Sequence, residues 1–155
     1  MAPRHLIVDG YCLLHRDPDM ARDLPRRLIP ARQQLLRLVE QAFPLLADRA
    51  TVVFDSRARR PPDPDLNLAI EVRYAAANET ADTVIEQMVA SAQRPREIMV
   101  VTSDHLEAQT VSAAGAEVMS CAEFLDRARA GLPAYMHRRA KAKSRTTLAD
   151  FFPTS

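Results

Sequence analysis

The stretch His5-Leu-Ile-Val-Asp9 decides the fold class of this chain. Consecutive apolar residues that end in a carboxylate are typical of a strand buried on both faces and finishing at a polar edge. Thr51-Val-Val-Phe-Asp55 repeats this pattern, and Glu97-Ile-Met-Val-Val-Thr102 is a third apolar run, which leads into Asp104. None of the three alternates polar and apolar residues, so the pattern favours a parallel sheet covered by helices on both faces.

Helical patterns separate the strand patterns along the whole chain. We predict helices over residues 30–47, with Pro44 kinking or ending the first, over 80–93 and over 104–114, and a last helix from the capping box Ser120–Glu123. Further strands are expected at 68–72 and 116–119. Alternating strands and helices predict an α/β fold of three layers, with a central parallel sheet of about five strands.

The composition is that of an ordinary globular protein. Of the 155 residues, 47% are hydrophobic and 26% are charged, and no apolar run is long enough to span a membrane. The start of the chain shows no secretory signal pattern. Cys12 and Cys121 are far apart and form no paired motif, so neither a structural disulfide nor a thiolate zinc site is expected. We therefore expect a cytoplasmic protein without membrane contact.

Positive charge is concentrated at the end of the chain. Residues 132–155 carry five basic residues and one acidic residue, a net charge of +4, which leaves −3 for the rest because the whole chain carries +1. We predict a folded domain over residues 1–131 and a basic C-terminal tail over 132–155 that is partly disordered or docks on the body. In that tail Leu148, Phe151 and Phe152 form an apolar motif that either binds a partner protein or packs back on the domain.

Acidic residues gather where the predicted strands end. Asp9, Asp55 and Asp104 follow three strands, and Glu79 and Asp82 share one face at the start of a helix. Parallel strands present their carboxyl ends at one edge, which is where ligands bind in such sheets. Each acid has an ordinary structural alternative, above all as a helix N-cap. Together they predict a site for Mg²⁺ or Mn²⁺, because the cluster offers oxygen ligands without histidine or cysteine.

Such a site suits the cleavage of phosphodiester bonds. A divalent ion lowers the pKa of a bound water and stabilises the attacking and leaving oxygens, so no nucleophilic side chain is needed. The chain has only three glycines and lacks the glycine-rich phosphate-binding motifs and the serine-hydrolase motif. A phosphatase that uses Asp9 as its nucleophile is disfavoured, because the second aspartate expected two residues later is Tyr11.

Four blocks of the sequence resemble a known family. Residues 6–11 (Leu-Ile-Val-Asp-Gly-Tyr), 52–55 (Val-Val-Phe-Asp), 78–82 (Asn-Glu-Thr-Ala-Asp) and 101–104 (Val-Thr-Ser-Asp) are similar to the blocks of YacP-like NYN domains, bacterial members of the PIN-like nuclease superfamily. The resemblance implies a PIN-like sheet and a metal-dependent endoribonuclease. Because some members are associated with cleavage of messenger RNA on the ribosome, it implies RNA and the ribosome as partners.

The resemblance also implies roles for individual residues. On matching positions, Asp9, Asp55, Glu79, Asp82 and Asp104 would form the catalytic acidic site. Asp9, Asp82 and Asp104 would bind the metal directly, whereas Asp55 and Glu79 would act through water or position the nucleophile.

Cys12 departs from the family pattern, which has asparagine after Asp-Gly-Tyr. An asparagine side chain donates and accepts hydrogen bonds, and a thiol replaces it poorly. Either the change is tolerated and the domain cuts RNA, or catalysis is weak and the domain chiefly binds RNA or the ribosome.

Positive side chains near the acidic edge would be needed to bind RNA. The loop after Asp55 is proline-rich and basic, and its arginines either contact phosphate or are merely solvated. The predicted substrate-binding residues are Cys12, Arg57, Arg59, Arg60, Arg73 and Ser103.

Overall fold

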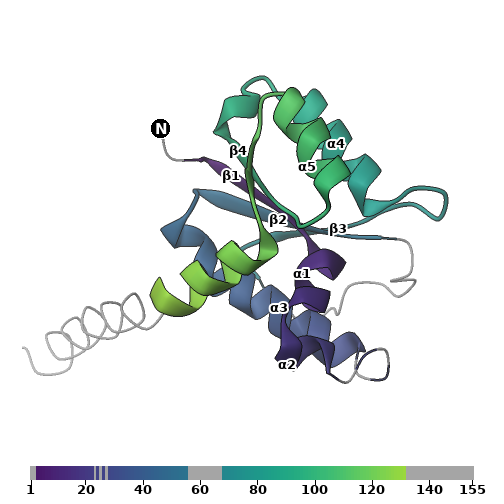
Figure 1. The fold of residues 1–155 in the computed structure, drawn as a ribbon, viewed down its shortest axis with the longest axis vertical. Helices are drawn as coiled ribbons and strands as arrows, with labels where there is room; N and C mark the ends of the chain where they lie inside the picture. Colours follow the sequence, from purple (N-terminus) through teal and green to yellow (C-terminus); the bar gives the residue numbers. More distant parts are fainter. Residues whose placement is uncertain (1–2, 23, 25, 27, 56–67, 132–155) are drawn as a thin grey trace, which may run out of the picture.

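The computed structural model describes residues 3–22, 24, 26, 28–55 and 68–131 of the chain. A five-stranded sheet crosses its centre (Figure 1), and every pair of neighbouring strands is parallel. In sequence the strands are β1 (His5–Asp9), β2 (Arg49–Phe54), β3 (Glu71–Tyr74), β4 (Ile98–Val101) and β5 (Glu117–Met119). Their order across the sheet is β3-β2-β1-β4-β5, so β1 has a neighbour on each side.

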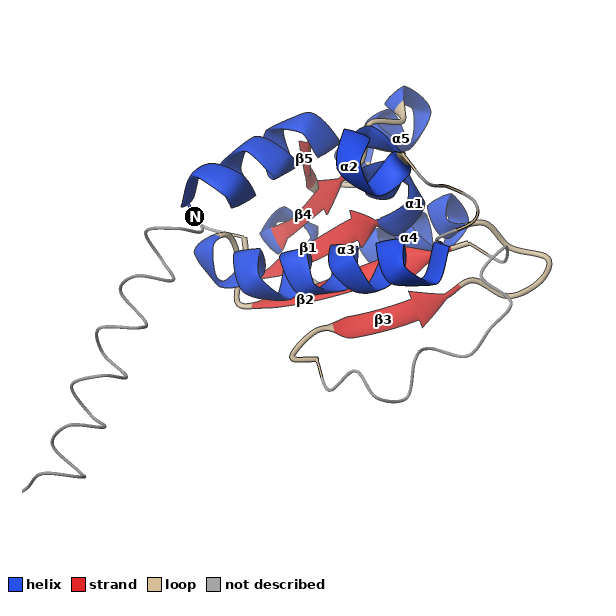
Figure 2. Ribbon diagram, turned by 90° about the horizontal axis from the view of Figure 1, so that it is seen from below, coloured by secondary structure: helices blue, strands red, loops and turns tan. Residues whose placement is uncertain are grey.

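Helices cover both faces of the sheet, which confirms the predicted three-layer α/β fold (Figures 1 and 2). One face carries α1 (Gly10–Arg16), α2 (Pro18–Ala21), α3 (Leu28–Ala42) and a helix over residues 121–131. The other face carries α4 (Ala81–Ala90) and α5 (His105–Ala113). Two 3-10 turns, η1 (Phe43–Leu45) and η2 (Pro95–Glu97), complete the described elements. None of the helices in this part of the chain has the length and apolarity needed to cross a bilayer.

Several element boundaries differ from the sequence-based expectations. The third strand, expected at 68–72, lies at Glu71–Tyr74. The helix expected over 30–47 ends at Ala42, and Pro44 lies in the 3-10 turn that follows, because proline cannot donate the next helical hydrogen bond. The short helices α1 and α2 were not predicted, since both are too short to show an apolar periodicity. The predicted tail over 132–155 lies outside the described residues.

The two faces of β1 explain its uninterrupted apolar run. Leu6 and Val8 pack into the core beneath α3, while Ile7 packs into the core beneath α4. All three side chains are fully buried. Burying a side chain of this size stabilises the fold by roughly 1.5–3 kcal/mol. The central strand is therefore held from both sides, and so is the residue that ends it, Asp9.

Gly10 allows the chain to turn sharply from β1 into α1. A Cβ atom at this position would overlap the ring of Phe54 on β2. That ring also lies tilted against Tyr11, with 5.1 Å between the ring centroids, and stacks on Tyr74, with 5.6 Å. The absence of a side chain at Gly10 thus lets the aromatic ring of β2 lie against the first turn of α1.

We predict that Gly10→Ala destabilises the fold by about 1–3 kcal/mol, the usual range for adding atoms to a filled core. The free energy of unfolding in urea measures the effect. Gly131→Ala is the matched control, because among the described residues its Cβ would meet only the end of the exposed Leu45 side chain, and alanine favours a helix. Equal stability of Gly10→Ala and the wild type would contradict the close packing at this turn.

Candidate metal centre

Three carboxylates from three elements meet at the carboxyl edge of the sheet. Asp9 ends β1, Asp82 lies in the first turn of α4, and Glu107 lies in the first turn of α5. One oxygen of each carboxylate lies within 4.8 Å of the others. Of the side chains that the structure describes, these three form the group able to hold a cation.

Local hydrogen bonds fix where each carboxylate emerges. Asp9 has extended backbone angles, and its Oδ1 accepts a hydrogen bond from the backbone N–H of Cys12 at 3.3 Å, so it caps α1. The hydroxyl oxygen of Thr80 accepts a hydrogen bond from the backbone N–H of Thr83 at 3.2 Å, so Thr80 is the N-cap of α4. Asp82 is the second residue after this cap and lies in the first turn of the helix. The carboxylates therefore stand at helix starts, where the helix dipole favours negative charge.

Glu107 is the most enclosed of the three acids, with 1% of its surface exposed. Its Oε2 accepts a hydrogen bond from the hydroxyl of Thr102 at 2.7 Å. The Thr102 hydroxyl oxygen is itself held by the N–H of Asp104 at 3.1 Å. The other oxygen, Oε1, is buried with no hydrogen-bond partner in the described part of the chain. A buried oxygen without a partner is costly, and a cation would satisfy it.

Burial and mutual repulsion change the acidity of this group. Burial raises the pKa of Asp9 to about 7, and charge on Cys12 and Asp82 adds to the shift. Burial also raises the pKa of Glu107 to about 9, with repulsion from Asp9 as the next cause. Like charges this close favour the protonated forms. Protons must therefore remain on the group unless a cation takes their place.

The dimensions and chemistry of the group fit a divalent ion. Oxygens on opposite sides of an octahedral Mg²⁺ lie about 4.2 Å apart, twice the usual bond length. The observed separations of up to 4.8 Å are close to this value. An all-oxygen set with neither histidine nor thiolate as ligand suits Mg²⁺ or Mn²⁺ better than Zn²⁺.

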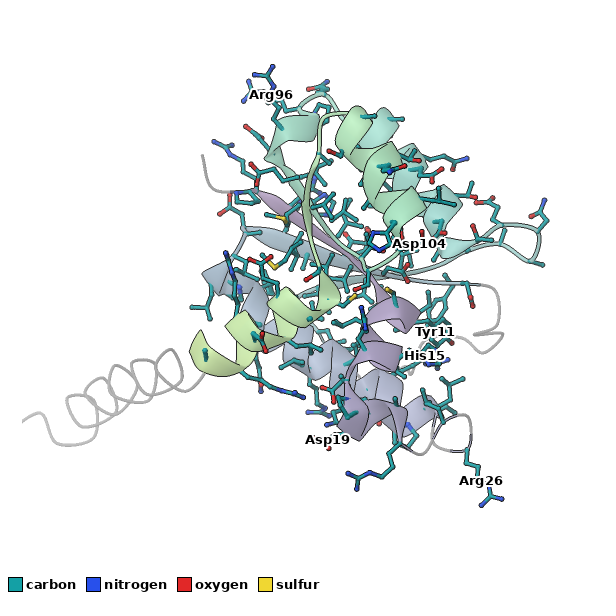
Figure 3. All side chains as sticks on the ribbon, in the orientation of Figure 1. Tyr11, His15, Asp19, Arg26, Arg96 and Asp104 are labelled. Carbon is teal, nitrogen blue, oxygen red and sulfur yellow. The ribbon has the colours of Figure 1, made fainter. Side chains whose placement is uncertain are left out.

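The predicted acids are divided by the structure. Asp9 and Asp82 belong to the carboxylate group, together with Glu107. Asp104, predicted as a direct ligand, is exposed and lies outside the group. Its Oδ1 accepts hydrogen bonds from the N–H groups of Leu106 at 2.9 Å and Glu107 at 3.2 Å, so it serves as the N-cap of α5. Figure 3 shows Asp104 near the middle of the view, well away from Arg96, which precedes β4 and lies at the top.

Asp55 and Glu79 are half-buried and also lie outside the group of three. Asp55 follows β2 directly, and Glu79 precedes the cap of α4, so both flank the edge where the group lies. That Asp55 and Glu79 bind the metal through water or position the nucleophile stays a prediction.

Glu107 is the site residue that the sequence did not reveal. It stands three residues after Asp104, in the position of a capping-box glutamate, so the sequence pattern favours an ordinary capping role. The predicted helix offered a signal that could have identified Glu107. When a helix begins at a strand end, the side chain of the third residue after its N-cap is able to point back over the edge of the sheet.

The predicted substrate-binding residues lie in different places. Arg57, Arg59 and Arg60 lie outside the described residues. Arg73 forms an ion pair with Glu71 at 2.7 Å and lines a cavity of about 520 Å³ beside His5 and Arg49, which begin β1 and β2. That cavity is at the amino ends of the strands, away from the three carboxylates.

Cys12 and Ser103 lie together beside the acidic group. The backbone N–H of Ser103 donates a hydrogen bond to the sulfur of Cys12 at 3.2 Å. The thiol of Cys121 donates to the same sulfur at 3.4 Å. This second hydrogen bond is the main reason that the pKa of Cys12 is lowered to about 6, while the pKa of Cys121 is raised.

The profile of the YacP-like NYN domain matches residues 6–150. The chain belongs to this family. Two crystal structures of Rae1 (YacP) from Bacillus subtilis are similar to it in fold and sequence. The W164L mutant superposes with a TM-score of 0.74 and 27% identity, covering 95% of this chain and 88% of that one. The second structure gives a TM-score of 0.69 and 26% identity, covering 94% and 82%. No curated protein matches the sequence.

Family membership confirms the resemblance of the four sequence blocks, and the two superpositions agree with the fold expected from them.

We predict that Glu107→Gln weakens Mn²⁺ binding by roughly tenfold or more, because loss of an outer partner of a ligand already costs about that much. Isothermal titration calorimetry on the metal-free protein measures the affinity. Asp104→Asn is the matched control, since asparagine caps a helix as well as aspartate does. Loss of affinity in the control but not in Glu107→Gln would place the ion elsewhere.

We predict that Mn²⁺ raises the melting temperature more at about pH 8 than at about pH 6. Because folding raises the pKa of Asp9 and of Glu107, their protonated forms stabilise the metal-free fold, and this stabilisation is complete only below the pKa values of the unfolded chain. It is lost as the pH rises through the folded pKa values, about 7 for Asp9 and about 9 for Glu107. Mn²⁺ competes with the protons on these two carboxylates, so the stabilisation of the fold by bound Mn²⁺ grows as the pH rises. Thermal unfolding with and without Mn²⁺ tests this, and a shift that is the same at both pH values contradicts it.

Proposed function

We propose that this protein is a divalent-metal-dependent endoribonuclease. The observation that carries the proposal is the meeting of Asp9, Asp82 and Glu107 at the carboxyl edge of a parallel sheet. Membership of the YacP-like NYN family supports a nuclease that acts on RNA. The geometry adds a candidate ligand set made of oxygen atoms, as Mg²⁺ and Mn²⁺ prefer.

Asp9, Asp82 and Glu107 would hold the ion. A bound ion of this kind lowers the pKa of a water molecule and stabilises the attacking and leaving oxygens at a phosphodiester. The chain contributes the fixed positions of its carboxylates. Asp9 is fixed by the end of β1 and by its cap on α1, and Glu107 is oriented by the hydroxyl of Thr102. Such preorganisation avoids rearrangement when the reaction begins.

Single-stranded RNA is the substrate class we propose. Arg57, Arg59 and Arg60 lie within five residues after Asp55 in the sequence, and we propose that they supply the positive charge that draws phosphate towards the acidic edge. Messenger RNA on the ribosome is a more specific substrate in the same class, carried by the family resemblance. A cytoplasmic location is consistent with two cysteines that are both free thiols.

An RNA-binding module with little turnover is the second candidate. The observation in its favour is the sulfur of Cys12, which stands where the family pattern has asparagine. Here the sulfur accepts hydrogen bonds from Ser103 and Cys121 and does not offer the amide chemistry of asparagine.

The two candidates give different results in one experiment. With Mn²⁺, the purified protein is expected to cleave end-labelled single-stranded RNA internally, and EDTA should stop the reaction. Asp9→Asn and Glu107→Gln should each lower the rate by roughly a hundredfold or more, because the metal centre supplies several kcal/mol of transition-state stabilisation. Asp104→Asn should stay close to the wild type.

The same reactions on ribosomes that carry a messenger RNA test the more specific substrate. Binding of RNA without cleavage, equal in the wild type and both acid variants, would favour the binding module and contradict the nuclease. Cleavage that persists in EDTA and in both variants would show that the metal centre is not needed for cleavage.

A further inference from the structure

The two cysteines of the chain meet beside the acidic group although they are 109 residues apart in sequence. Cys12 lies in the first turn of α1, just after β1. Cys121 is the first residue of the helix over 121–131, just after β5. Strand β4 lies between β1 and β5 in the sheet, so the two sulfurs meet over the end of β4.

The end of β4 holds both cysteines in this position. The N–H of Ser103 donates to the sulfur of Cys12 at 3.2 Å, and the Ser103 hydroxyl oxygen accepts the backbone N–H of Cys121 at 3.2 Å. The two sulfurs are 3.4 Å apart. A disulfide bond is about 2.05 Å long, so the sulfurs need to approach by only about 1.3 Å.

Their exposures differ in a way that sets the order of reaction. Cys12 is half-buried, whereas Cys121 is 0% exposed. A small oxidant therefore meets Cys12 first, and Cys121 stands behind it as the second thiol. Redox-active cysteines commonly show this arrangement of an accessible thiol beside a resolving one.

We propose that Cys12 and Cys121 form an oxidisable dithiol site in which hydrogen peroxide produces an intramolecular disulfide. In the first step the sulfur of Cys12 attacks one peroxide oxygen, the O–O bond breaks, and Cys12 becomes a sulfenic acid as water leaves. In the second step the sulfur of Cys121 attacks the sulfur of Cys12, the S–O bond breaks, and a second water leaves. The two thiols together lose two protons and two electrons, and the peroxide is reduced to two waters.

The bond would act on the neighbouring carboxylates through short contacts. Closing the disulfide draws the Cys12 sulfur away from the N–H of Ser103 and from the Thr102 hydroxyl, which lies at 4.0 Å and orients Glu107. The backbone N–H of Cys12 is the group that Asp9 caps. Oxidation therefore disturbs the supports of two of the three carboxylates and weakens metal binding. This consequence rests on the proposed metal centre, whereas formation of the disulfide does not.

The test first follows the thiols. Reductant-free protein is treated with hydrogen peroxide, alkylated in denaturant and examined by mass spectrometry and peptide mapping. We expect a monomer that has lost two hydrogens, a linked pair of peptides containing Cys12 and Cys121, and full recovery of both thiols with dithiothreitol. Overoxidised Cys12 beside an alkylated Cys121, or a disulfide between two chains, would overturn the proposal.

Metal binding gives the second readout. Calorimetry with Mn²⁺ should show about tenfold weaker binding to the oxidised protein than to the reduced protein, the size of effect expected from disturbing outer partners of the ligands. Cys121→Ala, checked for its fold by circular dichroism, should bind Mn²⁺ like the reduced wild type and form no linked peptide pair. Unchanged affinity after a complete disulfide would overturn the coupling. Absence of Mn²⁺ binding in the reduced protein would count against the proposed function, and the thiol analysis would still decide whether the disulfide forms.

Discussion

The candidate site depends on one electrostatic constraint, the convergence of negative charge at one edge of the sheet. Asp9, Asp82 and Glu107 bring three carboxylates within 4.8 Å, and two of them are buried. At an effective dielectric constant of about 20, two unit charges roughly 4 Å apart repel by about 4 kcal/mol. This repulsion is relieved either by protons that stay on the carboxylates or by a bound cation. The raised pKa values of Asp9 and Glu107 correspond to the first of these.

The turns at this edge serve two purposes. The residues that end strands also begin helices, so Asp9 closes β1 and caps α1, and Asp104 caps the helix that presents Glu107. Because β1 has neighbours on both sides and α4 and α5 cover the same face, the starts of these two helices lie near the end of β1. The position of the acidic group is therefore a consequence of the topology, and Gly10 makes it possible by admitting the ring of Phe54.

The fold could be predicted from the sequence because its signals are local. Uninterrupted apolar runs such as residues 6–8 identify buried parallel strands, and the rule that ligands bind at the carboxyl edge identified Asp9. The site was predicted less completely. A carboxylate that caps a helix and one that belongs to a group of acids look alike in sequence, so Asp104 and Glu107 were not told apart. The contact between Cys12 and Cys121 depends on the order of the strands, which no local pattern contains.

The most direct test of the metal centre is anomalous diffraction from a crystal of this protein grown with Mn²⁺. We predict a peak bonded to oxygens of Asp9, Asp82 and Glu107, at distances of about 2.0–2.4 Å. A peak bonded to Asp104 and not to Glu107, or three empty carboxylates beside a manganese ion bound elsewhere, would contradict it.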